Sequence, residues 1–531
     1  MTTDALVIHT THGPVRGFAD GPVQVWKGIP FAAAPVGELR WRAPRVPLAW
    51  SEVRDATVFG NVCPQAANAV ISLDPTAPHD EDCLNLNVWR SSGSTTGTDG
   101  TGETPGAGAD SSGALVPVMV WVHGGAYVFG SSSQKLFDGA SLVAGGEVIL
   151  VTINYRLGGL GFLELSSLNS ETEHFDTNLA LRDVVLALEW VRDNIAAFGG
   201  DPKAVTLFGE SAGGGIVTTL MTVPAAKGLF ARAVAQSSPA TSVYDEHRAS
   251  TVASAFLEQL EVTPEQAVML RDISVDRIVE ASMAVFQKVP TTAPGTLAFA
   301  PVVDGDLVPE HPLTVFREGR AHAVPLIIGT NKDEAAMFTM MKSPLMPIQP
   351  DTIREMFNGI AAEHPEITLP SEAQIGSAYS GLSVKAEGMG VARDVGFRMP
   401  AVWIAEGQSV VAPVYLYRFD WATPMLRMLG IGATHATELP YLWGNLVSGP
   451  KDITFKLGGL RVGKTVSAHM QERWLAFAVT GTPHGLEGEP EWRSYTQGER
   501  STLVIDRHDR VVDDLDGDLR KAWGDEVLSF L

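Results

Sequence analysis

Five continuous apolar runs, each ending at turn residues, constrain the fold of this chain more than any other feature. They cover residues 116–122, 147–155, 204–208, 324–329 and 414–419. Runs that are apolar throughout indicate strands covered on both faces. Between the second and third runs, residues 179–198 show helical spacing of apolar side chains and end at Gly199 and Gly200. Strands that alternate with helices predict an α/β fold around a mostly parallel sheet.

The rest of the chain is expected to belong to the same domain. With 531 residues, 45% of them hydrophobic, the chain can bury a large core as one big domain or two ordinary ones. We expect one domain over residues 1–531, in which the less regular segments 240–300 and 340–410 form helical excursions that roof a pocket. Residues 91–113, rich in Gly, Ser and Thr, are predicted to form a flexible surface loop.

The charge balance argues against several classes of partner. Lys and Arg number 39 and Asp and Glu 61, which gives a net charge of −22 with no basic run. Nucleic acid and anionic membranes are therefore poor partners. The first residues lack the basic and apolar regions of a secretory signal, and the longest apolar runs are too short to span a membrane. We expect a cytoplasmic protein that binds a small molecule, as a monomer or a weak homo-oligomer.

Two cysteines, Cys63 and Cys83, are too few for a disulfide scaffold or a four-ligand zinc site. A disulfide between them would close one loop and contribute about 3 kcal/mol by the chain-entropy argument. Two free thiols are equally consistent with a reducing compartment. The sequence leaves both alternatives open.

The run at 204–208 leads directly into a candidate nucleophile, within the sequence AVTLFGESAGGG. The pattern G-x-S-x-G between a strand and a helix is the nucleophile elbow, a tight turn that lifts the serine hydroxyl above the sheet edge. Gly209 and Gly213 flank Ser211 because a Cβ atom would clash in that turn. By itself the five-residue pattern also fits an ordinary loop.

A second glycine turn, in the sequence WVHGGAYVFG at residues 121–130, follows the apolar run at 116–122. An HGG turn after a strand is the usual source of further oxyanion-hole donors in α/β-hydrolases. Each such donor contributes about 3 kcal/mol in the transition state. A plain glycine turn would not explain why this sequence occurs together with GESAG. The two turns together predict an α/β-hydrolase fold.

Further motifs resemble those of the type B carboxylesterases, the family that also holds the cholinesterases. After Gly209-Glu210-Ser211-Ala212-Gly213, the resemblance extends to residues 26–44, 81–89, 198–214, 299–309, 329–338 and 432–445. The sequence CPQ before a short loop to EDCL is similar to that of bacterial para-nitrobenzyl-esterase-like members. The resemblance runs nearly from end to end. It implies a large central sheet flanked by helices, with helical excursions over an active-site gorge.

The resemblance also implies site residues. It makes Ser211 the nucleophile, Glu334 the acid and His435 the base. The implied oxyanion hole is formed by the backbone of Gly124, Gly125 and Ala212. From the residues alone, His435 is notable because it follows the run at 414–419 on a Gly-Ala-Thr turn, and a capping or packed histidine is the alternative.

Three other features are assigned with the help of the resemblance. Glu210 is expected beside the site in a supporting role, as a negative charge that favours the imidazolium or as a group that holds backbone or water. Ser237 resembles a supporting serine near the acid. Two further pairs resemble buried structural ion pairs of the family, namely Arg40 with Glu81 and Arg156 with Asp183.

The implied reaction is two-step acyl transfer to an ester, with neither metal nor cofactor. The loop between Cys63 and Cys83 contains no aromatic residue, so it lacks the cation–π site with which cholinesterases bind choline. We therefore expect small to medium apolar or aryl esters. Flexible methionines could line an adaptable pocket, or could equally be ordinary core: Met337, Met340, Met341, Met346, Met425 and Met428. The alternatives are a carbamate or aryl-amide hydrolase with the same triad and, more remotely, a non-catalytic binding member of the family.

Overall fold

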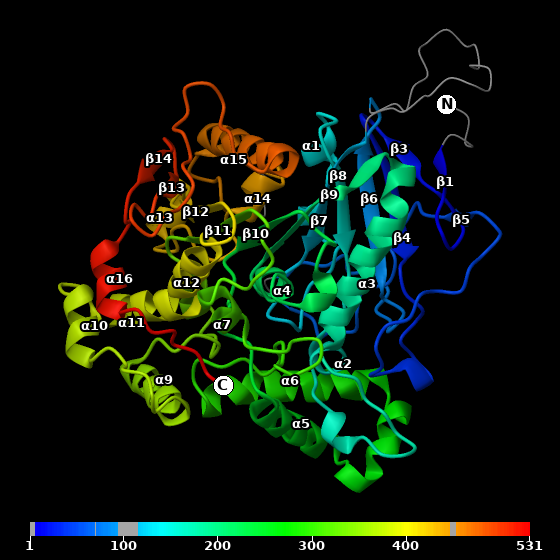
Figure 1. The fold of residues 1–531 in the computed structure, drawn as a ribbon, viewed down its shortest axis with the longest axis horizontal. Helices are drawn as coiled ribbons and strands as arrows, with labels where there is room; N and C mark the ends of the chain where they lie inside the picture. The colour runs from blue at the N-terminus through cyan, green and yellow to red at the C-terminus, as the bar shows by residue number, and fades with distance from the viewer. Residues whose placement is uncertain (1–5, 69–70, 94–114, 447–452) are drawn as a thin grey trace.

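One large sheet organises the part of the chain that the computed structural model describes, residues 6–68, 71–93, 115–446 and 453–531. Within these residues the sheet has eleven strands, in the order β14-β13-β12-β11-β10-β9-β7-β8-β6-β4-β3 (Figure 1). Its strands are β3 (Phe18–Asp20), β4 (Val23–Pro30), β6 (Asn85–Ser91), β7 (Val116–Val122), β8 (Ile149–Ile153), β9 (Gly200–Glu210), β10 (Arg232–Gln236), β11 (Leu326–Asn331), β12 (Val414–Phe419), β13 (Thr502–Ile505) and β14 (Arg510–Val512). A small separate sheet contains β1 (Val7–His9), β2 (Pro14–Arg16) and β5 (Arg54–Asp55).

The centre of the large sheet is parallel, and its two edges are antiparallel. Strands β8, β7, β9, β10, β11, β12 and β13 pair in parallel, and the strands outside them pair in antiparallel fashion. The five predicted apolar runs correspond to β7, β8, β9, β11 and β12. The predicted α/β-hydrolase architecture is confirmed, and β10 and the edge strands complete the sheet.

Both faces of the central strands are covered, as continuous apolar runs predict. Along β7, Val118, Val120 and Val122 belong to one buried hydrophobic cluster, and Met119 and Trp121 belong to another. Successive side chains of a strand point to opposite faces, so the two clusters lie on opposite sides of the sheet.

The helices divide between these two faces (Figure 1). Residues of α3 (Leu179–Asn194), α4 (Ala212–Leu220) and α12 (Met399–Gln408) belong to the first cluster. Residues of α1 (Ala140–Val143), α14 (Leu439–Leu442) and α15 (Leu460–Thr480) belong to the second. The remaining α-helices are α2 (Gly158–Gly161), α5 (Glu246–Leu260), α6 (Val275–Thr292), α7 (Pro312–Arg317), α8 (Ala335–Met340), α9 (Pro350–Glu363), α10 (Glu372–Ala378), α11 (Val384–Arg393), α13 (Pro424–Met428) and α16 (Gly517–Trp523).

The helix expected over residues 179–198 forms with a tightened last turn. α3 ends at Asn194, and a 3-10 helix continues over Ile195–Phe198 before Gly199 adopts a φ of 89°. Glycine tolerates this left-handed conformation without the cost that a Cβ atom would add. The chain then enters β9, the strand that leads to Ser211.

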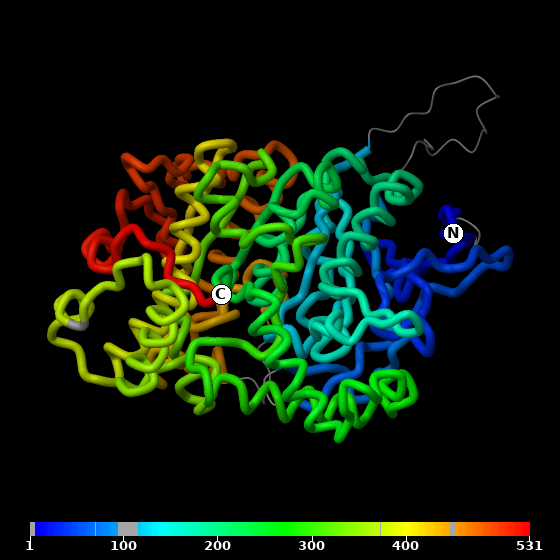
Figure 2. The backbone as a smooth tube through the Cα atoms, turned by 60° about the horizontal axis from the view of Figure 1, so that its bottom comes forward, coloured from blue at the N-terminus to red at the C-terminus, as the bar shows by residue number. Residues whose placement is uncertain are grey.

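Two helical segments lie outside the sheet and its covering helices. Residues 240–300 contain α5 and α6, and residues 340–410 contain α9, α10 and α11 before the chain returns to the sheet in α12. Figure 2 shows the first segment in green along one side and the second in yellow-green at one end. Across the described residues, no helix combines the length and the apolar character that crossing a membrane requires.

The two cysteines and the Gly/Ser/Thr-rich segment both lie near the N-terminal strands. Cys63 and Cys83 form a disulfide, with their Cα atoms 5.1 Å apart. The Gly/Ser/Thr-rich segment predicted over residues 91–113 begins inside the sheet, because Ser91 is the last residue of β6. From residue 94 onward, that segment lies outside the described residues.

Both predicted structural ion pairs are present and buried. The guanidinium of Arg40 donates to both carboxylate oxygens of Glu81, at 2.8 and 2.5 Å, and that of Arg156 donates to Asp183 at 2.9 and 2.7 Å. None of these four residues lines the gorge described below.

Candidate active site

The predicted site residues follow the carboxyl ends of five adjacent strands, β12, β11, β10, β9 and β7. Parallel strands that lie side by side end at the same edge of the sheet, so the loops after them meet there. His435, Glu334, Ser237, Ser211 and Gly124 lie beyond the ends of these strands, in that order. The topology thus collects at one edge residues that are far apart in the sequence.

Ser211 occupies a sharp turn between β9 and α4. Its φ of 55° and ψ of −124° place it in a backbone conformation that residues other than glycine rarely adopt. The turn requires close backbone contacts: a Cβ at Gly209 would lie 2.6 Å from the carbonyl carbon of Gly213, and one at Gly213 would lie 2.1 Å from the carbonyl oxygen of Val122. This is the geometry expected of a nucleophile elbow.

The imidazole of His435 lies between Ser211 and Glu334. Its Nε2 is 2.8 Å from the Ser211 Oγ, and its Nδ1 is 2.6 Å from Oε2 of Glu334. The rings of Phe338 and Phe397 lie beside it, with centroids 5.3 and 4.8 Å from the imidazole centroid. His435 is buried, so these contacts restrict its ring to one orientation.

Glu334 is held on its other side by two donors. Its Oε1 accepts a hydrogen bond from the Ser237 hydroxyl at 2.6 Å and one from the backbone N–H of Asn331 at 2.7 Å. The neighbouring carboxylate of Asp333 accepts the backbone N–H of Ala433 at 3.0 Å. Of the two adjacent acids in the sequence KDEA, Glu334 is therefore the one that contacts the histidine.

Glu210 contacts the same ring nitrogen that faces the serine. Its Oε1 lies 3.3 Å from Nε2 of His435. Burial alone would lower the pKa of His435, but the charges of Glu210 and Glu334 outweigh burial and raise that pKa to about 9. Burial raises the pKa of Glu210 itself to about 8, against the opposing effect of His435. The expected negative charge beside the site is thus a carboxyl group that takes up a proton more readily than an exposed glutamate does.

Three backbone N–H groups lie in the two turns at the serine. Within the described part of the chain, the amides of Gly124, Gly125 and Ala212 have no hydrogen-bond acceptor in the protein. A Cβ at Gly124 would lie 3.1 Å from the Cβ of Ser211, so only glycine allows the HGG turn to approach this closely. Ala212 is the first residue of α4, and its N–H therefore points out of the helix start.

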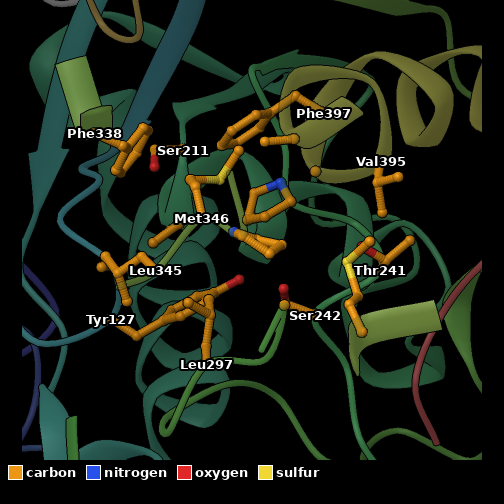
Figure 3. A pocket seen from close by; sticks show the side chains of 18 residues that line it. Tyr127, Ser211, Thr241, Ser242, Leu297, Phe338, Leu345, Met346, Val395 and Phe397 are labelled. Atoms are coloured by element: carbon orange, nitrogen blue, oxygen red, sulfur yellow. The ribbon is translucent and has the colours of Figure 1, made fainter. Parts of the chain in front are cut away.

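A gorge with two lobes opens onto Ser211. The Tyr127 lobe, of about 700 Å³, has walls from Tyr127, Leu297, Met346, Val395 and Phe397 (Figure 3). The His435 lobe, of about 1010 Å³, is lined instead by residues that include His435, Glu210, Gly124, Phe286 and Met341. Ser211, Ala126, Phe338 and Leu345 border both lobes.

Only some of the predicted methionines line this gorge. Met337 and Met341 line the His435 lobe and Met346 lines the Tyr127 lobe, whereas Met340 and Met428 are exposed by 61% and 65%. Met356, which the sequence reasoning missed, also lines the Tyr127 lobe. Residues of both helical segments contribute to the gorge, as Leu297 and Phe397 illustrate (Figure 3).

Sequence reasoning also missed a buried carboxyl group behind the triad. Glu438 is fully buried and accepts hydrogen bonds from the side-chain amides of Gln236 and Asn331. Burial raises its pKa. Its position three residues after His435, at the start of α14, is the one signal in the sequence that could have indicated it.

One group of potential metal ligands lies elsewhere. Among the described residues, His469, Glu489 and Asp509 bring a ligand atom each within 4.8 Å of one another. The buried guanidinium of Arg473 lies 3.6 Å from both carboxylates and already supplies a positive charge there. None of these residues lines the gorge.

The fold and the site define the class first: this chain is an α/β-hydrolase. A family model described as the carboxylesterase family matches residues 4–522. The chain belongs to the carboxylesterase family.

Individual relatives agree with this membership. The para-nitrobenzyl esterase of Bacillus subtilis is 36% identical over 525 residues, covering 97% of this chain and 98% of its own. The phenmedipham hydrolase of Pseudarthrobacter oxydans is 30% identical, covering 94% of each chain. A solved carboxylesterase structure from Geobacillus stearothermophilus has a TM-score of 0.81 and 34% identity, and covers 98% of this chain and all of its own.

These findings establish the chain as a carboxylic ester hydrolase. They do not favour the alternative of a carbamate or aryl-amide hydrolase. The remote alternative, a non-catalytic binding protein, is not supported either.

Proposed function

We propose that Ser211 is the nucleophile, His435 the general base and Glu334 the acid of a two-step esterase reaction. His435 takes the proton of the Ser211 hydroxyl, and Ser211 attacks the ester carbonyl. His435 then returns the proton to the leaving alcohol, and water releases the acid from Ser211. The observation that carries this proposal is the ring of His435, with Nε2 2.8 Å from Ser211 and Nδ1 2.6 Å from Glu334.

The oxyanion hole of this reaction would consist of the amides of Gly124, Gly125 and Ala212. The support is that these donors are free in the described part of the chain and belong to the two turns beside Ser211. Donors that are already oriented stabilise the charge that develops on the carbonyl oxygen without further reorganisation.

Glu210 and Ser237 have supporting roles in the same proposal. Glu210 stabilises the imidazolium that forms when His435 takes the serine proton, because its carboxylate lies 3.3 Å from Nε2. Ser237 holds Glu334 in place through its hydrogen bond to Oε1, so that Oε2 faces Nδ1.

The two lobes suggest how an ester lies in the gorge. The leaving oxygen must receive its proton from Nε2 of His435, so the alcohol part belongs in the His435 lobe and the acyl part in the Tyr127 lobe. Both lobes have mainly apolar walls, which suits small to medium apolar or aryl groups. The name of the Bacillus subtilis relative, para-nitrobenzyl esterase, supports an aromatic alcohol in the larger lobe.

The organisation of the chain is part of the proposal. One domain carries the sheet and the site, and the segments 240–300 and 340–410 act as its roof, because both contribute side chains to the gorge. A cytoplasmic location, a monomeric or weakly oligomeric state and the absence of a nucleic-acid partner stay predictions from composition.

A substrate panel tests this function. Purified enzyme would be assayed on para-nitrophenyl esters of increasing acyl length, on benzyl esters, on aryl carbamates and on anilides. We expect turnover of the esters, with benzyl esters accepted and carbamates and anilides far slower. Carbamate or anilide turnover faster than that of every ester would overturn the proposal.

A further inference from the structure

A second cavity lies on the other side of the helix that follows Glu334. This rear cavity, of about 800 Å³ including space open to solvent, is lined by residues that include Lys332, Asp333, Tyr379, Ala386 and Arg393. None of its lining residues borders either lobe of the gorge. It is therefore a separate site. The loop after β11, which carries Asp333 and Glu334, forms it together with α10, α11 and α16 (Figure 1).

The walls of the rear cavity combine space with apolar surface. Small residues leave the space, with Ala335 and Ala336 on α8 and Ala386 and Gly390 one turn apart on α11. Leucine, methionine and tyrosine side chains supply apolar surface. Such walls accept a compact apolar group.

Two cationic side chains give the cavity a preference among apolar ligands. Arg393 donates to Asp394 through Nε and Nη2, at 2.7 and 3.0 Å, which fixes the guanidinium and leaves Nη1 without a partner in the described part of the chain. Lys332 is exposed, and its charge acts on the neighbouring carboxylate of Asp333. The one carboxylate that lines the cavity, on Asp333, accepts the N–H of Ala433 and also interacts electrostatically with Lys332 and Arg393, so each cation already has an acidic neighbour. The Nη1 of Arg393 and the ammonium of Lys332 remain as hydrogen-bond donors for a carboxylate on the ligand.

The wall between the rear cavity and the gorge is α8 itself. Its Ala335 and Ala336 line the rear cavity, and its Met337 and Phe338 line the gorge. Asp333 adds a second connection, because its backbone N–H donates to Ala433 at 2.9 Å while its carboxylate accepts from the same residue. Ala433 lies two residues before His435. A ligand in the rear cavity would thus press on the segments that position Glu334 and His435.

We propose that the rear cavity is a second small-molecule site, for a compound with an apolar body and one carboxylate, and that its occupant changes turnover in the gorge. The binding half is independent of the proposed function, and the regulatory half rests on it. The ligand's carboxylate lies at Lys332 and Arg393, and its apolar body lies against α10 and α11.

Binding is tested by calorimetric titration of octanoate into the full-length enzyme and four variants. Ala386→Trp fills the cavity from α11, and Leu382→Trp fills it from the turn before α11. Each variant should remove one class of octanoate site. If one variant fails to fold, the other still tests the site. Lys332→Gln should weaken octanoate binding at the rear cavity about fivefold, which is the effect of one partly exposed ion pair. Lys385→Gln, an exposed lysine next to the cavity that does not line it, serves as the matched control and should bind as the unmodified enzyme does. Octan-1-ol, which lacks the carboxylate, should bind this class more weakly.

The regulatory half has a separate readout. Octanoate that also enters the gorge would raise KM, whereas octanoate in the rear cavity should change kcat for para-nitrophenyl acetate at the concentrations that saturate the binding. Ala386→Trp should abolish the kcat effect and keep any KM effect. Unchanged octanoate stoichiometry in both tryptophan variants would overturn the site, and a kcat effect that persists in a folded Ala386→Trp enzyme would overturn the coupling. Neither readout depends on which residue is the nucleophile.

Discussion

Glu210 Oε1 lies 3.3 Å from Nε2 of His435, the ring nitrogen that also faces the hydroxyl of Ser211. Each nitrogen of the imidazole therefore has a carboxylate beside it, Glu334 at Nδ1 and Glu210 at Nε2. Both favour the charged ring, and together they raise the pKa of His435 to about 9 against the effect of burial. The acidic limb of the enzyme's pH profile should therefore depend on both carboxylates.

The Glu210→Gln variant should shift the acidic limb of the pH profile. His435 must be neutral to accept the serine proton, so activity is lost as the pH falls through its pKa. Removing the Glu210 charge destabilises the imidazolium, lowers that pKa, and should move the acidic limb of kcat/KM down by about one pH unit. The plateau rate should fall as well, because the imidazolium formed during attack loses the same stabilisation.

Glu438→Gln is the control for this measurement. Its carboxyl group is equally buried but bonds to Gln236 and Asn331, and it should shift the limb less than Glu210→Gln does. A limb that stays in place or moves to higher pH in Glu210→Gln would contradict the electrostatic role.

The two acids of the KDEA sequence should differ sharply in their effect on turnover. Glu334→Gln keeps the shape of the side chain but cannot fix the imidazole tautomer or stabilise the imidazolium, and kcat should fall about 10⁴-fold by analogy with the serine-protease triad. Asp333→Asn keeps an oxygen that can accept the N–H of Ala433, so its loss should be mild. Both rates are measured on one para-nitrophenyl ester, with folding checked by circular dichroism. The opposite ranking would make Asp333 the acid.

Two methionines allow the lobes to be tested against each other. Met346→Trp narrows the Tyr127 lobe and should lower kcat/KM for long acyl chains more than for acetate. Met341→Trp narrows the His435 lobe and should instead lower kcat/KM for esters of bulky alcohols. The comparison uses methyl octanoate, with a long acyl chain and a small alcohol, and benzyl acetate, with a short acyl chain and a bulky alcohol, on both variants, and the released acid is titrated. If each variant impairs the two substrates equally, or if the preferences are exchanged, the assignment of acyl and alcohol lobes is wrong.

Loss of the disulfide should reduce stability and affect one lobe. The bond between Cys63 and Cys83 closes the loop that carries Asn68 and Ile71, and both of these residues line the His435 lobe. Replacing both cysteines by alanine should lower the free energy of unfolding by about 3 kcal/mol, measured by urea denaturation. KM should rise for bulky alcohol esters and remain similar for small ones. Unchanged stability would mean that the bond does not constrain the chain.

The sequence predicted the sheet well because its signals are local. Apolar runs such as residues 116–122 and 204–208 each carry their own pattern, and β7 and β9 form where those runs lie. By contrast, β10, with the sequence RAVAQ, is short and begins with an arginine, so it stands out only once its neighbours are in place. The order of the strands in the sheet likewise depends on contacts between distant segments.

The candidate site divides in the same way. The elbow at Ser211 and the HGG turn at Gly124 could be read from glycine spacing, because each is one local turn. His435 and Glu334 needed the family resemblance, since the hydrogen bond that joins them spans 101 residues of sequence. Glu438 was missed because a buried glutamate is recognised only by what surrounds it, here Gln236 and Asn331.

The turnover of Ser211→Ala tests the central claim most directly. The variant would be assayed on para-nitrophenyl acetate beside the unmodified enzyme, with circular dichroism and melting temperature as controls of folding. If Ser211 forms the acyl-enzyme, kcat should fall about 10⁶-fold while the fold is retained, by analogy with removal of a protease nucleophile. A well-folded Ser211→Ala protein with activity near that of the unmodified enzyme would contradict the account.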